Sequence, residues 1–230
     1  MTKLPVPAAS PPPTLSTVTA LLLAGGRGSR MGGVDKGLQA FRGQPLAWHA
    51  LQRLAQQQGG PLGGVLLNAN RHAQAYEALG EAEQGIGRVR VLPDTVQDYS
   101  GPLAGMAVGL AHCHTPLLLT VPCDSPLFPL DLALRLLDAM QATQADIAVA
   151  QAPEPDAAGQ PVLRSQPVFC LLKTSLAPSL VKYMAEGGRK ISAWTERHAV
   201  AAVPFDAPHD APDAFANANT LDELHQLEGR

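Results

Sequence analysis

The sequence predicts a single α/β domain: a doubly wound, mostly parallel, Rossmann-like sheet with helices on both faces. Short apolar runs alternate along the chain with segments whose apolar residues recur at the helical period, which is typical of this fold class. The first apolar run, residues 18–23, is apolar on both faces, as a strand buried inside a parallel sheet would be. A length of 230 residues suits one such domain and leaves little room for a second.

The predicted strands are short runs of mostly apolar residues followed closely by glycine, proline or a polar residue. In chain order they are residues 18–23, 65–67, 89–92, 117–121, 147–150, 168–172 and 200–203. The stretch 152–161 is rich in proline, alanine and glycine and is predicted to be a loop.

The predicted helices lie between these strands. Pro45 suits a first helical turn, and the pair of glycines at 59–60 would end that helix. Thr220 and Glu223 have the spacing of a capping box, which predicts a terminal helix. The remaining helices are expected near residues 101–112, 130–140, 176–186 and 189–197.

Residues 1–16 form a segment of proline, serine, threonine and alanine with almost nothing to bury. We predict a disordered tail there, followed by one domain over 17–230. The segment lacks the unbroken apolar core of a secretory signal, and no apolar run approaches the roughly 20 residues of a spanning helix. These features predict a cytoplasmic protein without a membrane anchor.

Composition excludes further classes of protein. The cysteines Cys113, Cys123 and Cys170 form no C-x-x-C pair, which argues against a disulfide framework or zinc ribbon and favours a reducing compartment. The formal net charge is −3 and the pI is near 6.1, whereas proteins that bind duplex nucleic acid usually carry a basic excess. We therefore expect no nucleic-acid partner.

Polar residues follow the first four predicted strands. The first strand runs into a glycine-rich loop, and Asn68, Asp94 and Asp124 lie at or just beyond the ends of the next three. Ligands of open α/β sheets bind outside the carboxyl ends of the strands. The sequence therefore predicts that backbone N–H groups, an amide and two carboxylates meet at one edge of the sheet.

The glycine-rich loop, residues 23–36, also carries Arg27, Arg30 and Lys36. Glycines let the backbone approach a phosphate closely, and the cations can neutralise it. The loop is not a dinucleotide fingerprint, because Met31 stands where the third glycine would be, and Lys36 is not followed by the Ser or Thr of a P-loop. The alternative is a flexible turn with solvated charges.

Asp124 is a candidate Mg²⁺ ligand, because a carboxylate at the end of a buried strand can hold this ion against a polyphosphate. The alternative is that Asp124 caps a helix. Asn68 and Asp94 are weaker candidates, since either can instead satisfy nearby backbone groups. The cluster 112–114, His-Cys-His, is better explained by a helix end than by a metal site.

Several stretches resemble the molybdenum cofactor guanylyltransferases, the MobA family within the nucleotidyltransferase superfamily. The resemblance covers nearly all of residues 17–228, without the proline-rich tail, and its motifs together are specific. They are LAGGRGSRMGGVDKG at 23–37, NANRH at 68–72, DYSGPLAGM at 98–106, PCDSP at 122–126 and FANANT at 215–220.

The resemblance implies transfer of GMP from GTP to the phosphate of molybdopterin, with release of pyrophosphate and with Mg²⁺ as cofactor. It implies that the N-terminal half binds the nucleotide, the C-terminal half binds the acceptor and residues 101–105 lie near the guanine. The implied nucleotide-binding residues are Leu23, Ala24, Gly25, Gly26, Lys36, Asn68, Asp94 and Asp124, with Asp124 on the metal, Lys36 and Arg30 on phosphates, and Asn219 in a supporting role.

Such a reaction needs no protein nucleophile, because the acceptor phosphate is already an anion. In the acceptor half, we hypothesise that Arg189 and Lys190 face the acceptor phosphate, helped by Lys182 and Arg197. A solvated helix face is the alternative. We expect a monomer that can act beside maturation proteins of molybdenum enzymes.

Three other functions stay open. The same chemistry with CTP is the nearest, and residues 101–105 lean towards the guanylyl branch by resemblance only. A sugar phosphate is another possible acceptor. A non-catalytic nucleotide-binding or delivery protein belongs to a different class, but it would not need both Lys36 and Asp124.

Overall fold

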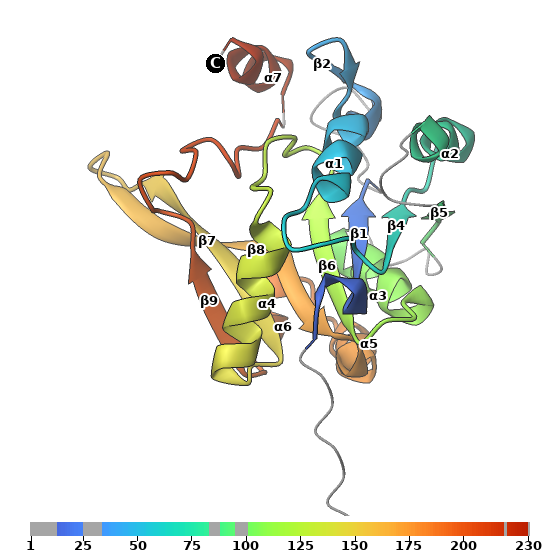
Figure 1. Cartoon of the computed structure of the whole chain (residues 1–230), viewed down its shortest axis with the longest axis vertical. Coiled ribbons are helices and arrows are strands. Elements are labelled where there is room, and N and C mark those ends of the chain that lie inside the picture. Colours follow the sequence, from blue (N-terminus) through green and yellow to red (C-terminus); the bar gives the residue numbers. More distant parts are fainter. Residues whose placement is uncertain (1–12, 25–33, 83–87, 95–100, 219, 230) are drawn as a thin grey trace, which may run out of the picture.

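The computed structural model describes residues 13–24, 34–82, 88–94, 101–218 and 220–229, and its centre is a seven-stranded sheet (Figure 1). The strand order is β5-β4-β1-β6-β8-β7-β9. β8 is antiparallel to both of its neighbours, and every other pairing is parallel. The predicted mostly parallel sheet is therefore confirmed. The strands are β1 (Val18–Leu23), β4 (Gly64–Asn68), β5 (Val89–Leu92), β6 (Leu117–Pro122), β7 (Ile147–Pro155), β8 (Pro161–Lys173) and β9 (Val200–Pro204).

Helices cover both faces of the sheet, as predicted. Alternate residues of β1 explain this arrangement: Ala20 and Leu22 pack into one core cluster, and Leu21 and Leu23 pack into the other. The first cluster includes residues of α1, α2 and α4, and the second includes residues of α3, α5 and α6. The helices are α1 (Leu46–Ala55), α2 (Ala73–Ala82), α3 (Pro102–His112), α4 (Leu132–Thr143), α5 (Ala177–Ala185), α6 (Ile191–Thr195) and α7 (Leu221–Glu228).

Most predicted boundaries hold to within a few residues, and the strands at 18–23 and 89–92 hold fully. The prediction of a loop over 152–161 is wrong. β7 continues to Pro155, and β8 begins at Pro161, so that the two strands form a long hairpin (Figure 1). Prolines are tolerated at the free edges of a two-stranded ribbon, where no ladder donor is lost.

The prediction did not include α2. Its apolar pattern is weak, since Tyr76 and Gly80 are the helix residues that are buried. The prediction also lacked the short hairpin of β2 (Ala40–Phe41) and β3 (Gln44–Pro45), and the single-turn helices η1 (Leu15–Thr17), η3 (Lys36–Leu38) and η4 (Thr174–Leu176).

The N-terminal boundary also differs from the prediction. Leu15 is 1% exposed and belongs to the core, and the carbonyl of Pro13 accepts a hydrogen bond from Gln141 Nε2 at 2.9 Å. The folded domain therefore begins before residue 17. Residues 1–12 lie outside the described residues, and among those described no helix combines the length and hydrophobicity that crossing a membrane requires.

The C-terminal helix packs against the β2–β3 hairpin (Figure 1). The predicted capping box is present, with Thr220 Oγ1 accepting from the Glu223 N–H and Glu223 Oε2 accepting from the Thr220 N–H. A third, smaller core joins Leu224 and Leu227 of α7 to Phe41. The end of the chain is thereby fixed beside the segment that follows Lys36.

Candidate active site

The carboxyl ends of four neighbouring strands meet at one edge of the sheet. Leu23, the last residue of β1, lies opposite Asn68 on one side and Pro122 on the other, and Asn68 lies opposite Leu92. Asp124 follows Pro122 by two residues. The sheet therefore gathers the ends of β5, β4, β1 and β6 at the edge where the sequence places its polar residues.

Asp94 is held by two asparagines, Asn68 at the end of β4 and Asn70 two residues beyond it. Its Oδ1 accepts a hydrogen bond from Asn68 Nδ2 at 2.9 Å, and its Oδ2 accepts one from Asn70 Nδ2 at 2.6 Å. Asn70 Oδ1 in turn accepts from the Asp94 N–H at 2.7 Å. The carboxylate of Asp94 is thus fixed in orientation at the edge of the sheet.

Asn68 also has a structural role, which is the alternative that the sequence left open for it. The side chain is 3% exposed, and Nδ2 donates to the carbonyl of Leu92 at 3.1 Å as well as to Asp94. Asn70 was not among the candidate residues. An amide two residues beyond a strand end is the signal that could have identified it.

The amine of Lys36 and the carboxylate of Asp124 form an ion pair, with Nζ 3.2 Å from Oδ2. Both side chains keep about a fifth of their surface exposed, at 20% and 19%, so both remain accessible to a ligand. Asp124 does not cap a helix, because α4 begins only at Leu132 and its N-cap is Asp131. The capping alternative for Asp124 is therefore wrong.

The loop after Asp124 is held from two sides. From α1, Arg53 donates to the carbonyls of Phe128 at 2.6 Å and Leu127 at 2.8 Å. From the C-terminal segment, the N–H of Ala218 donates to the carbonyl of Asp124 at 2.8 Å. These bonds fix the backbone around the carboxylate independently of any ligand.

The side chain of Ser125, which is fully buried, adds a further bond to the same segment by donating to Asn217 Oδ1. The motif at 215–220 thus packs directly against the motif at 122–126. The loops that carry Asp124 and Lys36 both contact the C-terminal region, the latter through Phe41 and α7.

The first turns of α3 lie against the same edge. A Cβ added to Gly105 would come within 2.4 Å of Asn68 Oδ1 and 2.5 Å of Leu23 Cδ2. Because these distances are shorter than any real Cβ contact, only glycine permits this approach. The segment 101–105 is therefore placed beside the proposed nucleotide residues.

Cys123 is buried between the core and Asp124, with 5% of its surface exposed. Burial raises the pKa of its thiol well above the ordinary value, and the negative charges of Asp124 and Asp35 raise it further. The thiol is accordingly neutral at physiological pH and does not resemble an activated nucleophile.

Several candidate residues lie outside the described part of the chain. These are Gly25, Gly26, Arg27, Arg30 and Asn219. Leu23 and Ala24 are described, and both are buried at the edge of the sheet, where the Ala24 N–H donates to the carbonyl of Asn68 at 2.8 Å.

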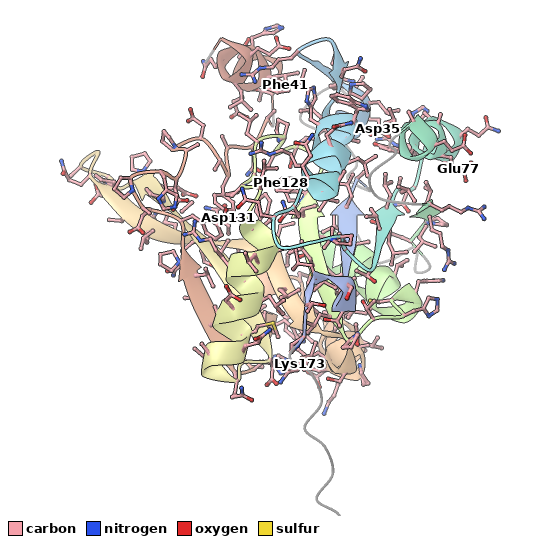
Figure 2. The ribbon with its side chains drawn as sticks, viewed as in Figure 1. Asp35, Phe41, Glu77, Phe128, Asp131 and Lys173 are labelled. Carbon is pink, nitrogen blue, oxygen red and sulfur yellow. The ribbon has the colours of Figure 1, made fainter. Side chains whose placement is uncertain are left out.

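The hypothesis that Arg189 and Lys190 face the acceptor phosphate stays a prediction, and the helix that precedes these residues begins at the end of the sheet away from Asp124. They follow α5, which begins after β8, and the last residue of β8, Lys173, pairs with Leu117 at the start of β6. Asp124 lies beyond the opposite end of β6. Figure 2 accordingly shows Lys173 and Asp35, the neighbour of Lys36, at opposite ends of the sheet.

The cations in this region also have local partners. Arg189 Nη1 donates to the carbonyl of Met184 at 3.3 Å, and Arg197 and Lys182 lie 3.4 Å and 4.0 Å from the carboxylate of Glu186. These contacts agree with the alternative interpretation, in which the basic residues belong to a solvated helix face and its ion pairs.

Two other clusters of possible metal ligands have local hydrogen-bond or ion-pair partners. His112 Nδ1 contacts the carbonyl of Val108 at 2.9 Å, which supports the helix-end interpretation of residues 112–114. Asp131, His209 and Asp210 bring possible ligand atoms within 4.8 Å of one another, and both carboxylates pair with Arg135, at 3.4 Å from Asp131 and 2.7 Å from Asp210.

Comparison with known families gives one match that covers most of the chain. The MobA-like NTP transferase domain family matches residues 20–203. This range includes Lys36, Asn68, Asp94 and Asp124, and extends from β1 into β9.

Close relatives cover almost the full length. The molybdenum cofactor guanylyltransferase of Albidiferax ferrireducens is 59% identical over 211 residues, which are 92% of this chain and 95% of that protein. The molybdenum cofactor guanylyltransferase of Ralstonia pickettii is 54% identical over 215 residues, 94% of this chain and 98% of that protein.

Solved structures agree on the fold. Molybdopterin-guanine dinucleotide biosynthesis protein A of Archaeoglobus fulgidus superposes with a TM-score of 0.69 at 20% identity, covering 92% of this chain and 97% of its own. The 4-diphosphocytidyl-2C-methyl-D-erythritol synthase of Anaerococcus prevotii has a TM-score of 0.70 at 13% identity, covering 92% and 94%. At these identities the likeness shows the fold alone.

Proposed function

The chain belongs to the MobA-like NTP transferase family and is a nucleotidyltransferase, and from this premise we propose that it transfers GMP from GTP to molybdopterin with release of pyrophosphate. The names of relatives that are 54% to 59% identical over more than nine tenths of the chain support this nucleotide and this acceptor. The structural observation that carries the proposal is the pairing of Lys36 with Asp124 at the edge of the sheet where Asp94 is also held.

Lys36 and Asp124 have the chemistry that this transfer requires. Attack of an acceptor phosphate on the α-phosphorus of GTP builds negative charge on the departing pyrophosphate. We assign Lys36 to the phosphates, where its ammonium neutralises that charge. We assign Leu23, Ala24, Gly25 and Gly26 to the nucleotide.

The residues at this edge fit a Mg²⁺ ion. Mg²⁺ prefers oxygen ligands and takes one or two carboxylates together with phosphate oxygens and waters. Asp124 offers a carboxylate that is partly exposed, so an ion can reach it. We propose that Asp124 holds the ion, which when bound would neutralise phosphate oxygens next to Lys36.

Asp94 and Asn68 are assigned to the nucleoside part of GTP. The side-chain amides of the two asparagines donate to both oxygens of the Asp94 carboxylate and so fix its orientation. A carboxylate fixed in this way is a directional acceptor for ring N–H or ribose hydroxyl donors. The nearby start of α3 would then lie beside the base.

The test is release of pyrophosphate by the full-length protein with Mg²⁺ and molybdopterin, comparing GTP with CTP. We expect release that requires the acceptor and prefers GTP. Preference for CTP would keep the chemistry and reject the guanylyl assignment. A folded protein that binds GTP but releases no pyrophosphate with this acceptor would reject the acceptor, and in that case sugar phosphates are the next acceptors to assay.

A further inference from the structure

A buried tyrosine contacts the residue next to Lys36. Tyr76, on α2, is fully buried, and its hydroxyl donates to Asp35 Oδ1 at 2.5 Å. Asp35 itself is 7% exposed. A core role alone does not require a hydroxyl.

The turn that carries Lys36 is built around this hydroxyl. A Cβ on Gly37 would lie 2.4 Å from Tyr76 Oη, so the absence of a side chain there lets the backbone pass over the tyrosine. The carbonyl of Asp35 also accepts from the Gln39 side chain at 3.1 Å and from the Leu38 N–H at 3.3 Å. Asp35 is therefore the anchor of the turn.

Tyr76 also connects the two halves of the candidate site. Its helix begins just after Asn68 and Asn70, which hold Asp94. The backbone N–H of Tyr76 donates to the carbonyl of His72 at 3.2 Å in the first turn of that helix. One side chain thus joins the helix that follows the Asp94 group to the turn that precedes the Lys36–Asp124 pair.

We propose that Tyr76 is a positioning residue for nucleotide binding. Its hydroxyl donates to the carboxylate of Asp35, so that this carboxylate does not attract the ammonium of Lys36, which stays directed at Asp124 and the phosphates. This inference rests on the proposed function. A buried carboxylate that loses its donor must find another partner, because an unpaired buried charge is costly. Lys36 is the cation next in sequence, and diverting it would withdraw its charge from the ligand.

The experiment is a thermodynamic cycle on GTP binding with Mg²⁺, measured by calorimetry and without any acceptor. Tyr76→Phe keeps the ring and removes the hydroxyl, and we expect it to weaken GTP binding by about 10-fold. Lys36→Ala should weaken binding at least as much. Because Tyr76 acts through Lys36, adding Tyr76→Phe to Lys36→Ala should cause no further loss.

A rescue variant sharpens the test. Adding Asp35→Asn to Tyr76→Phe removes the charge that would divert Lys36, and we expect the affinity for GTP to return to within about threefold of the parent. The pair of substitutions also removes the buried unpaired carboxylate, so it supplies a folded protein if Tyr76→Phe alone does not fold.

Tyr183→Phe is the matched control. Tyr183 is 6% exposed, and its hydroxyl donates to the carbonyl of Lys190 at 3.0 Å, on the α5 side of the molecule away from Lys36. We expect this variant to lose some thermal stability and to bind GTP normally. An equal loss of affinity in Tyr183→Phe would mean that GTP binding follows general destabilisation, which overturns the proposal.

The remaining outcomes separate this inference from the proposed function. If Tyr76→Phe weakens binding equally with and without Lys36, or if Asp35→Asn gives no rescue, Tyr76 does not act through Lys36 and the inference is wrong while the function stands. If Lys36→Ala leaves GTP binding unchanged, the assignment of Lys36 fails and the inference fails with it. Because the cycle is measured without any acceptor, its outcome does not depend on which acceptor the protein uses.

Discussion

Lys36 Nζ lies 3.2 Å from Asp124 Oδ2, although the two residues are 88 positions apart in the chain. Each residue is presented by a turn with its own supports, Lys36 by the turn at Asp35 and Asp124 by the loop that Arg53 holds. The contact therefore joins two preformed elements, and it does not depend on one flexible side chain reaching another.

Asp124→Asn should abolish most turnover while leaving the fold intact. The amide keeps the size of the side chain but cannot supply the negative charge that a divalent cation requires, so we expect a loss of activity on the order of 100-fold or more. The pair with Lys36 is partly exposed, so the change in the free energy of unfolding should stay below about 1 kcal/mol. Pyrophosphate release and thermal unfolding check the two expectations.

Asp131→Asn is the control, because Asp131 is in the same loop as Asp124. Its carboxylate lies 3.4 Å from Arg135, and this pair is away from Lys36. Its turnover should remain near that of the parent protein. Full activity in Asp124→Asn would show that Asp124 is not the essential ligand.

Cys123→Ala should leave turnover nearly unchanged, within about threefold, because the proposed transfer needs no protein nucleophile. The raised pKa of the buried thiol keeps it protonated at neutral pH. The substitution should cost about 1 kcal/mol of stability through the lost packing. Rates with GTP and acceptor, and the midpoint of urea unfolding, measure these effects. A loss of turnover approaching that of Asp124→Asn would instead indicate covalent catalysis.

Much of the fold could be predicted because its strands are short, apolar and separated by strong turn signals. β1 is buried on both faces, and its bounds follow directly from its composition. The hairpin of β7 and β8 could not be predicted in the same way. Its prolines resemble a loop locally, and only the pairing of Glu154 with Val162 and its neighbours across the ribbon makes the segment a strand.

The candidate site was predictable where it depends on strand ends and not where it depends on loop contacts. Asn68, Asp94 and Asp124 had to lie at one edge once their strands were parallel neighbours. The bond between Tyr76 and Asp35 joins residues 41 positions apart across a weakly amphipathic helix. No local pattern in the sequence indicates this contact, because it depends on how distant segments pack.

The ion pair between Arg135 and Asp210 should make stability depend on pH. Burial acts to raise the pKa of Asp210, but hydrogen bonds and the charge of Arg135, 2.7 Å away, outweigh it and lower that pKa below its ordinary value. A carboxyl group with a lowered pKa in the folded state contributes stability above its unfolded pKa, near 4. That stability is lost as the pH falls through the folded pKa.

Asp210→Asn should therefore cost roughly 2 kcal/mol at pH 7, a cost that shrinks as the pH falls below about 4. Urea unfolding across this range gives the comparison, with the exposed Asp206→Asn as a control that should differ little from the parent. A constant cost at all pH values would mean that the charge of Asp210 is not what stabilises the fold.

Gly105→Ala should impair nucleotide binding by moving α3 away from the edge of the sheet. The new Cβ would fall 2.4 Å from Asn68 Oδ1, and Asn68 cannot retreat without breaking its bond to Asp94. We expect a loss of stability of roughly 1–3 kcal/mol from overpacking. We also expect the KM for GTP to rise by about 10-fold, because Asp94 loses its orientation.

Gly109→Ala separates these two effects. It lies one turn further along α3, and its Cβ would meet Leu21 Cδ2 at the same 2.4 Å, but in the core away from Asn68. The two variants should lose similar stability, and only Gly105→Ala should raise the KM for GTP. If Gly109→Ala raises the KM equally, the effect comes from displacement of the whole helix, and the direct contact of Gly105 with Asn68 has no separate role in nucleotide binding.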